Sequence, residues 1–251
     1  MPKKNTQKLN RYQRKLILDM LNGDGTIDCG RLKMKHSIKQ EDYVLWKQQL
    51  LNNAGVKSSI SYTTSKSFGK EYPTIVLRTK TYNALKHMRY WLYRPKKFIY
   101  YNSYFKNLDD LSIAIWYLDD GSYCKYLNHP EKPGSLRIYT YTSYDINKII
   151  QKFFIERYNI SFNIKFKSPN DLKKNPNYNP SLTYLITETK SNIENFLNIV
   201  RPYANEIKSL QYKINHNIFM KDCINNNLNS KNDAEMLSSE VGDTHASDDI
   251  V

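Results

Sequence analysis

The sequence predicts an α+β fold made of two similar halves, each with an antiparallel sheet. Segments with helical spacing of apolar residues are separated by segments in which apolar and polar residues alternate, as in half-buried strands. The same order of segments occurs twice. In each copy the first apolar run ends in an acidic residue and a glycine, in "LILDMLNGDGTID" (16–28) and in "IAIWYLDDGSYCK" (113–125).

The first half begins with a helical run over 12–22, followed over 30–38 by a strand with one basic and one apolar face. The basic face carries Arg31, Lys33 and Lys35, and the apolar face carries Leu32 and Met34. The next segment, 39–55, predicts a helix that stops at Gly55. Its apolar residues at helical spacing are Tyr43, Leu45, Trp46 and Leu50.

A hairpin and a third helix complete the first half. Segments 56–64 and 72–80 have strand character, and Gly69 lies in the turn region between them. The pattern over 82–93 predicts a helix, which Pro95 ends.

The second half repeats this order. We expect a helix over 111–119, a strand over 135–142, a helix over 143–159, paired strands over 160–167 and 181–190, and a helix over 191–200. Ser143 is expected to be the N-cap of its helix, and Pro202 to follow the end of the last one. Chance similarity is the alternative to a duplication, but the shared order, faces and acid positions favour the duplication.

The charge of the chain indicates a polyanionic partner. The formal net charge is +14, and it divides into −6 from residue 222 onward and +20 over residues 1–221. A body this basic favours nucleic acid over a merely soluble protein with a basic surface. Three widely spaced cysteines predict neither a disulfide framework nor a zinc cluster, and no apolar run is long enough to cross a membrane.

The two acid–glycine ends predict a metal site. If the two apolar helices pack about a pseudo-two-fold axis, Asp24 and Asp120 lie side by side. Neighbouring carboxylates repel, and Mg²⁺ neutralises such oxygen ligands well. Carboxylates that hold metal beside a phosphate are typical of a nuclease. A single Asp-Gly would more often be an ordinary turn, but two equivalent copies in a basic chain favour the metal site.

The runs "ILDMLNGDG" (17–25) and "IAIWYLDDG" (113–121) resemble the two signature helices of LAGLIDADG homing endonucleases of the single-chain, intron-encoded type. The resemblance covers roughly residues 10–220 and departs from the motif at Asp19 and Ile115, which stand in the place of its first glycine. It implies two pseudo-symmetric αββαββα subdomains joined through the paired helices. It also implies strands that saddle the DNA major groove and metal-dependent cleavage of both strands across the minor groove.

The resemblance also implies roles for individual residues. Asp24 and Asp120, each before the last motif glycine, would be metal ligands and catalytic residues, with Mg²⁺ as cofactor and Mn²⁺ as a substitute. The preceding Gly23 and Asp119 would offer backbone carbonyls, and we rank the Asp119 side chain lower because the first half has no matching acid. The lysines expected to polarise the attacking water are Lys97, with Lys96 as fallback, and Lys213. Neutralising phosphate is the competing role for these lysines.

The polar strand faces are expected to bind double-stranded DNA through base edges and phosphates. A solvated sheet face is the alternative, but these faces are basic and poor in glutamate. The expected DNA-binding residues are Arg31, Lys33, Lys35, Lys57, Ser59, Ser61, Arg78 and Lys80 in the first half, and Arg137, Tyr139, Tyr141, Asn163, Lys165, Lys167 and Thr187 in the second.

We therefore expect an N-terminal subdomain (1–100), a C-terminal subdomain (101–225) and an acidic, disordered tail (226–251). The favoured function is a site-specific homing endonuclease acting as a monomer on a long asymmetric site. An RNA maturase that binds intron RNA and a DNA-binding repressor are the alternatives, and the retained acids favour cleavage. The abundance of Lys, Asn, Ile and Tyr suggests an AT-rich coding sequence, which fits a mitochondrion. A phage, bacterial cytoplasm or another organelle stays open.

Overall fold

The computed structural model describes residues 8–67, 69–92, 105, 107–125, 129, 131–166 and 183–215. The elements of the first half are α1 (Arg11–Asn22), β1 (Thr26–Asp28), β2 (Arg31–Ser37), the 3₁₀ helix η1 (Ile38–Gln40), α2 (Glu41–Asn53), β3 (Ser58–Ser67), β4 (Lys70–Thr79) and α3 (Asn83–Leu92). Those of the second half are α5 (Asp110–Asp120), β5 (Gly121–Cys124), β6 (Ser135–Thr142), α6 (Tyr144–Tyr158), β7 (Asn163–Phe166), β8 (Thr183–Thr187), α8 (Lys190–Ala204) and the 3₁₀ helix η2 (Lys208–Lys213).

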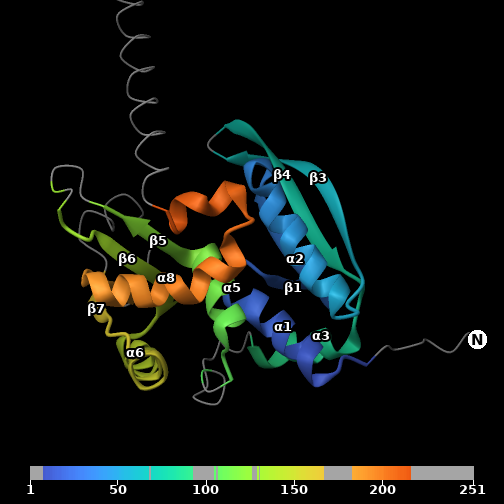
Figure 1. Ribbon diagram of the computed structural model, residues 1–251. Coiled ribbons are helices and arrows are strands. Elements are labelled where there is room, and N and C mark those ends of the chain that lie inside the picture. The colour runs from blue at the N-terminus through green and yellow to red at the C-terminus, as the bar shows by residue number, and fades with distance from the viewer. Residues whose placement is uncertain are drawn as a thin grey trace, which may run out of the picture. The chain divides into compact units, whose positions relative to one another are not determined.

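The two halves share one sheet topology. Each sheet has four antiparallel strands, in the order β1-β2-β4-β3 in the first and β5-β6-β8-β7 in the second (Figure 1). Helix α2 packs on β3 and β4, and α6 packs on β7 and β8. The predicted α+β fold with two similar antiparallel halves is confirmed.

The described residues up to Ile214 belong to one compact unit with two hydrophobic cores. Each core takes a side chain from the other half: Ile115 of α5 lies in the first, and Tyr43 of α2 lies in the second. The expected domain boundary at residue 100 and the tail 226–251 lie outside the described residues. None of the helices in the described ranges has the length and hydropathy of a membrane-spanning segment.

The edge strands β1 and β5 were not predicted as separate elements. They have three and four residues, too few for an alternating pattern to be recognised. β1 begins directly after Gly25 and β5 begins at Gly121, and each pairs with the next strand in the chain, β1 with β2 and β5 with β6.

The buried face of α2 differs from the expected one. Leu45 is 46% exposed, whereas Tyr43, Val44, Lys47 and Leu51 are buried. Residues 43, 47 and 51 follow one another at intervals of four, so they form one stripe of the helix. A lysine therefore lies on the face of α2 that meets the rest of the protein.

Helix α8 passes through Pro202 instead of ending before it, so that prediction was wrong. The helix continues because Asn205 N–H donates to the Arg201 carbonyl and Ala204 is buried in the core. Ser143 takes the predicted N-cap position of α6, but its side chain makes no capping hydrogen bond.

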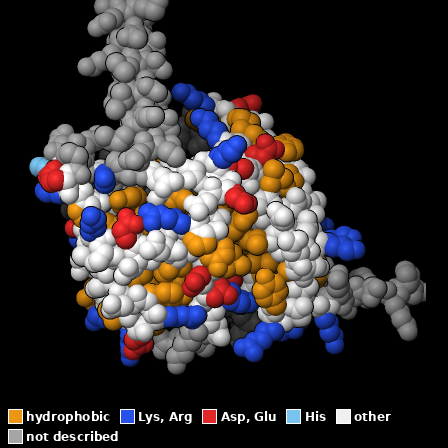
Figure 2. Space-filling view, viewed as in Figure 1, with side chains coloured by type: hydrophobic (Ala, Val, Ile, Leu, Met, Phe, Trp, Pro, Cys, Tyr) orange, Lys and Arg blue, Asp and Glu red, His pale blue; other side chains and the backbone are white. Residues whose placement is uncertain are grey.

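Hydrophobic side chains reach the surface where α1, α2 and α5 meet, with lysines and arginines mainly around the edge of this face (Figure 2). Arg14 and Leu18 of α1 and Met88 and Leu92 of α3 help to line a shallow groove with a volume of about 430 Å³. The side chains that line this groove are mainly apolar. The region where α1 and α5 end is acidic, with Asp24, Asp119 and Asp120.

Candidate active site and nucleic-acid interface

The two motif helices start alike and end together. Both α1 and α5 begin with a capping box, formed by Asn10 with Gln13 and by Asp109 with Ser112, and the helices pack against each other. At the other end, the Asp24 backbone N–H donates to Asp119 Oδ2 at 3.1 Å. The acidic ends of the two motifs are thus in direct contact.

The Asp119 side chain lies in the middle of this contact. Its Oδ1 accepts hydrogen bonds from Lys47 Nζ at 2.6 Å and from the Tyr43 hydroxyl at 2.9 Å. The side chains of Asp119 and Lys47 are both 0% exposed. Because protein donors satisfy both of its oxygens, Asp119 contributes to the site as an organising group.

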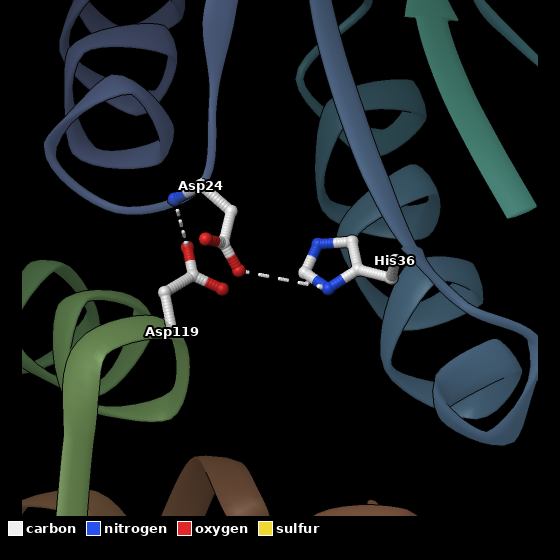
Figure 3. Close-up of side chains that lie close together, drawn as sticks. All are labelled: Asp24, His36 and Asp119. Carbon is white, nitrogen blue, oxygen red and sulfur yellow. Dashed lines mark hydrogen bonds and ion pairs between the residues drawn. The ribbon is translucent and has the colours of Figure 1, made fainter. Parts of the chain in front are cut away.

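Asp24 points outward, toward His36 at the end of β2 (Figure 3). Its Oδ2 lies 3.7 Å from His36 Nδ1, and its side chain is 45% exposed. Asp24, His36 and Asp119 bring one ligand atom each within 4.8 Å of the others, a spacing suited to a metal ion. Burial and the charge of Lys47 lower the pKa of His36, which keeps the imidazole neutral and able to bind metal.

Asp120 and Lys213 complete the cluster. Lys213 Nζ donates to the backbone carbonyls of Leu118 at 2.6 Å and Asp119 at 3.1 Å, so a buried cation lies at the carboxyl end of α5. Burial raises the pKa of Asp120 to about 7, and the charges of Asp119 and Asp24 add to the rise. Burial and the charge of Asp119 also raise the pKa of Asp24.

These residues fit a divalent cation. Three carboxylates, Asp24, Asp119 and Asp120, face two ammonium groups, Lys47 and Lys213, which leaves an excess of negative charge when all are ionised. Burial, and after it the neighbouring carboxylates, raise the pKa values of Asp24 and Asp120, and a bound cation would relieve both effects. Hard oxygen donors are those that Mg²⁺ prefers. The candidate carbonyls of Gly23 and Asp119 lie on the same two motif ends.

Of the lysines predicted to act in catalysis, one lies among the described residues. Lys213, one of the two chosen, is at the site. Lys97 and its fallback Lys96 lie outside the described residues.

The basic set of the first half lies on one face of its sheet. Lys33, Arg78 and Ser59 pair across β2, β4 and β3, so their side chains stand in one row. Lys35 and Ser61 flank Val76 in the next row. The remaining members, Arg31, Lys57 and Lys80, are exposed at the strand ends.

The corresponding face of the second sheet is more aromatic. Arg137, Ile186 and Asn163 form one row, and Lys165 pairs with Tyr184 in the next. The rings of Tyr139 and Tyr141 stack at 6.2 Å, where β6 has an irregular register between Ile138 and Thr142.

Thr187 does not share the polar sheet face with the other described members of the predicted DNA-binding set. Thr187 is only 2% exposed and pairs with the buried Leu136, so it belongs to the core face, and its prediction as a DNA contact was wrong. Thr187 and its neighbour Ile186 lie on opposite faces of β8, and both are buried. The sequence pattern therefore did not show which of the two faces meets the core. Lys167 lies outside the described residues.

The sequence patterns did not predict His36, Tyr43 and Lys47 as site residues. The available signal was Lys47 at the centre of the 43–47–51 stripe of α2, where a lysine has no reason to be buried unless it meets an acid. His36 likewise occupies a buried position in the alternation of β2.

Comparison with known proteins agrees with this geometry. The model of the LAGLIDADG DNA endonuclease family matches residues 14–196, which include both acid–glycine ends. The chain belongs to this family. The structure of the homing endonuclease I-WcaI bound to its DNA recognition sequence is similar, with a TM-score of 0.65 and 21% identity, covering 84% of this chain and 89% of that one. At this identity the likeness shows a shared LAGLIDADG fold.

Curated relatives match only in part. Protein RecA of Mycolicibacterium flavescens is 30% identical over 123 residues, which are 46% of this chain and 27% of that protein. Protein RecA of Mycobacterium gastri is 32% identical over 141 residues, 52% of this chain and 32% of that protein. The chain thus spans about a third or less of the length of these relatives.

The departures from the LAGLIDADG motif are packed into the helix interface. Ile115 is buried in the first core, and Asp19 is 1% exposed. Asp19 pairs with Lys15 at 2.8 Å, and Lys15 also reaches Asp109 of the other half at 2.9 Å. Burial raises the pKa of Asp19 to about 6. An ion-pair network thus links the helices at the level where the motif has its first glycine.

We expect Asp120→Asn to stabilise the metal-free protein at high pH. The folded-state pKa of Asp120, about 7, lies above its ordinary value of 3.8. The folded wild type is therefore most stable below pH 3.8, and its unfolding free energy falls as the pH rises toward 7. The shift corresponds to at most about 4 kcal/mol. In a chelating buffer, thermal unfolding should show a more stable variant at pH 8 and equal stabilities at pH 4. A variant less stable than wild type at pH 8 would contradict the assigned environment.

Proposed function

We propose that this chain is a site-specific homing endonuclease that makes a metal-dependent double-strand break in a long DNA site. The observation that carries the proposal is the contact between the two motif ends, which brings Asp24 and Asp120 to one acidic cluster. Membership of the LAGLIDADG DNA endonuclease family supports an endonuclease in general.

Asp24 and Asp120 are the proposed metal-binding carboxylates, helped by the backbone carbonyls of Gly23 and Asp119. A bound Mg²⁺ or Mn²⁺ would lower the pKa of the attacking water and stabilise the charge on the leaving 3′ oxygen. Lys213, buried against the end of α5, holds a positive charge near the carboxylates, where it would also stabilise charge on a scissile phosphate. His36, neutral at pH 7, can orient a water or bind the metal beside Asp24.

The two sheet faces are the proposed DNA-binding surface. The rows of Lys33 with Arg78 and of Arg137 with Asn163 occupy equivalent places in sheets of the same topology. Two related faces suit the two halves of one duplex site, and their different side chains suit an asymmetric sequence. One chain supplies both halves, so we propose that it acts as a monomer.

We expect the triple variant Arg31→Ala, Lys35→Ala and Lys80→Ala to weaken DNA binding at every sequence tested. Loss of phosphate contacts should reduce the slope of log affinity against log salt by about 0.9 for each contact removed. Fluorescence anisotropy over a range of salt concentrations measures the slope. Lys152→Ala is the control, because Lys152 pairs with Glu156 on the surface of α6. An unchanged slope in the triple variant would place DNA elsewhere.

Cleavage itself can be tested without knowing the target. The purified protein is incubated with a library of long randomised duplexes, with Mg²⁺ or with a chelator, and the ends produced are sequenced. The proposal predicts a single family of related sites cut on both strands only when metal is present. Specific binding without cutting would favour the repressor, and stimulation of intron RNA splicing without cutting would favour the maturase.

We separately propose a cellular location for the protein. A mitochondrial location fits the AT-rich coding sequence that the abundance of Lys, Asn, Ile and Tyr suggests, and a phage or bacterial location is the alternative. Fractionation of the cells that express the chain distinguishes these locations.

A further inference from the structure

The two metal-binding carboxylates are held in different ways. Asp120 is the last residue of α5, so the helix itself fixes its backbone. Asp24 lies two residues beyond the end of α1, in a turn after Gly23. The turn is closed behind it by the Gly25 N–H, which donates to the Met20 carbonyl at 2.9 Å. Asp24 therefore needs support that Asp120 does not.

Asp119 supplies that support. Its Oδ2 accepts the Asp24 backbone N–H at 3.1 Å, and a Cβ placed on Gly23 would lie only 2.0 Å from the same oxygen (Figure 3). The carboxylate thus lies directly against the turn, and only a glycine at position 23 leaves room for it. The Asp119 side chain is what fixes the direction of the Asp24 backbone.

Lys47 in turn holds Asp119. Its Nζ lies 2.6 Å from Asp119 Oδ1 and 4.3 Å above the ring of Tyr43, which donates to the same oxygen. Lys47 and the Asp119 side chain are fully buried. Removal of one partner from such a pair leaves an uncompensated buried charge, which forces the other to move or to be neutralised.

Among the residues that the structure describes, this arrangement occurs in the first half alone. The corresponding helix of the second half, α6, buries Asn147, Ile150 and Phe154 and no charged side chain. Position 23 is a glycine, so no carboxylate stands opposite Asp119 to support the Asp120 side in the same way. The support of Asp24 through Lys47 and Asp119 is therefore an asymmetric feature of a pseudo-symmetric fold.

We propose that Lys47 is a positioning residue for one of the two strand cuts, acting through Asp119 on the turn that carries Asp24. The inference rests on the proposed endonuclease function. The two DNA strands are related by the two-fold axis of the duplex, as the two motifs are related in the protein. Each carboxylate therefore lies nearer one scissile phosphate, and loss of the support given by Lys47 impairs the cut that depends on Asp24.

The test variant is Lys47→Met, which keeps the length of the side chain and removes its charge. Lys15→Met is the matched control, because it breaks an ion pair between α1 and Asp109, at the other end of α5. The double variant Lys47→Met with Asp119→Asn restores neutrality and keeps an acceptor for the Asp24 N–H. Because the double variant leaves no unpaired buried charge, it can be tested even if Lys47→Met alone does not fold.

The first readout is the strand ratio on a plasmid carrying one target site, with each strand labelled. Lys47→Met is expected to accumulate nicked plasmid, because one cut slows by roughly 10- to 100-fold while the other stays near the wild-type rate. The double variant should recover linear product, and Lys15→Met should keep the wild-type strand ratio. Equal slowing of both cuts, or no recovery in the double variant, would overturn the proposal.

The second readout needs neither metal nor cutting. The Asp24 amide, bonded to a buried carboxylate, should be protected from hydrogen exchange in metal-free wild type and in the double variant, and should exchange faster in Lys47→Met. Unchanged exchange in Lys47→Met would refute the positioning role even if the enzyme cuts. If the wild type cuts no DNA, the proposed function fails, and the exchange experiment still decides what Lys47 holds.

Discussion

Replacement of Asp120 with asparagine is expected to lower double-strand cutting by roughly 10³-fold or more while DNA affinity stays close to wild type. Asparagine has nearly the same shape as aspartate but carries no charge for a divalent cation. Burial raises the pKa of the Asp120 carboxylate, and the neighbouring charges of Asp119 and Asp24 raise it further, so a bound cation would stabilise its ionised form. Gel-based cleavage and anisotropy with the same duplex separate cutting from binding.

The matched control for this variant is Asp110→Asn at the opposite end of the same helix. Asp110 accepts a hydrogen bond from Tyr158 at 2.8 Å on the exposed side and takes no part in the acidic cluster. It should cut at the wild-type rate. Cutting by Asp120→Asn at the wild-type rate would remove Asp120 from the metal site, and Asp24 with His36 and Asp119 would then be the remaining candidate ligands.

Periodicity predicted the longer elements well because their patterns are local. The alternation of Leu32 and Met34 with basic residues placed β2 and its two faces correctly. The same reasoning misplaced Thr187, because β8 buries Ile186 on one face and Thr187 on the other, and a strand buried on both faces has no informative alternation. Pro202 misled for a related reason, since core packing carried α8 past it.

The site residues likewise divide into those that a local sequence pattern predicts and those that only the folded chain brings together. The acid–glycine ends could be found because the motif is written contiguously, twice. The support of Asp119 by Lys47 could not, because it joins residues 72 positions apart from different halves. Ranking the Asp119 side chain low followed from the absence of an acid at position 23. That glycine turned out to be what admits the Asp119 carboxylate to the turn.

Truncation of Phe196 to alanine is expected to cost about 3–5 kcal/mol of unfolding free energy, the largest loss of stability among the variants considered. Phe196 of α8 is 0% exposed, and its ring meets those of Tyr117, Phe154 and Phe162 at 5.1, 5.8 and 5.7 Å. Its removal leaves a cavity between α5, α6 and α8 that these rings cannot fill. For a domain of this size the melting temperature should fall by roughly 6–20 °C.

Ile155→Ala on the exposed side of α6 is the control for that variant. Ile155 is 46% exposed, so its truncation should change stability by less than about 0.5 kcal/mol. Because Tyr117 both packs on Phe196 and donates its hydroxyl to the Lys213 carbonyl at 2.7 Å, the cavity also loosens the support of Lys213. Phe196→Ala should therefore slow cutting modestly below its melting temperature. A fully stable Phe196→Ala protein would mean that α8 does not pack into the second core as described.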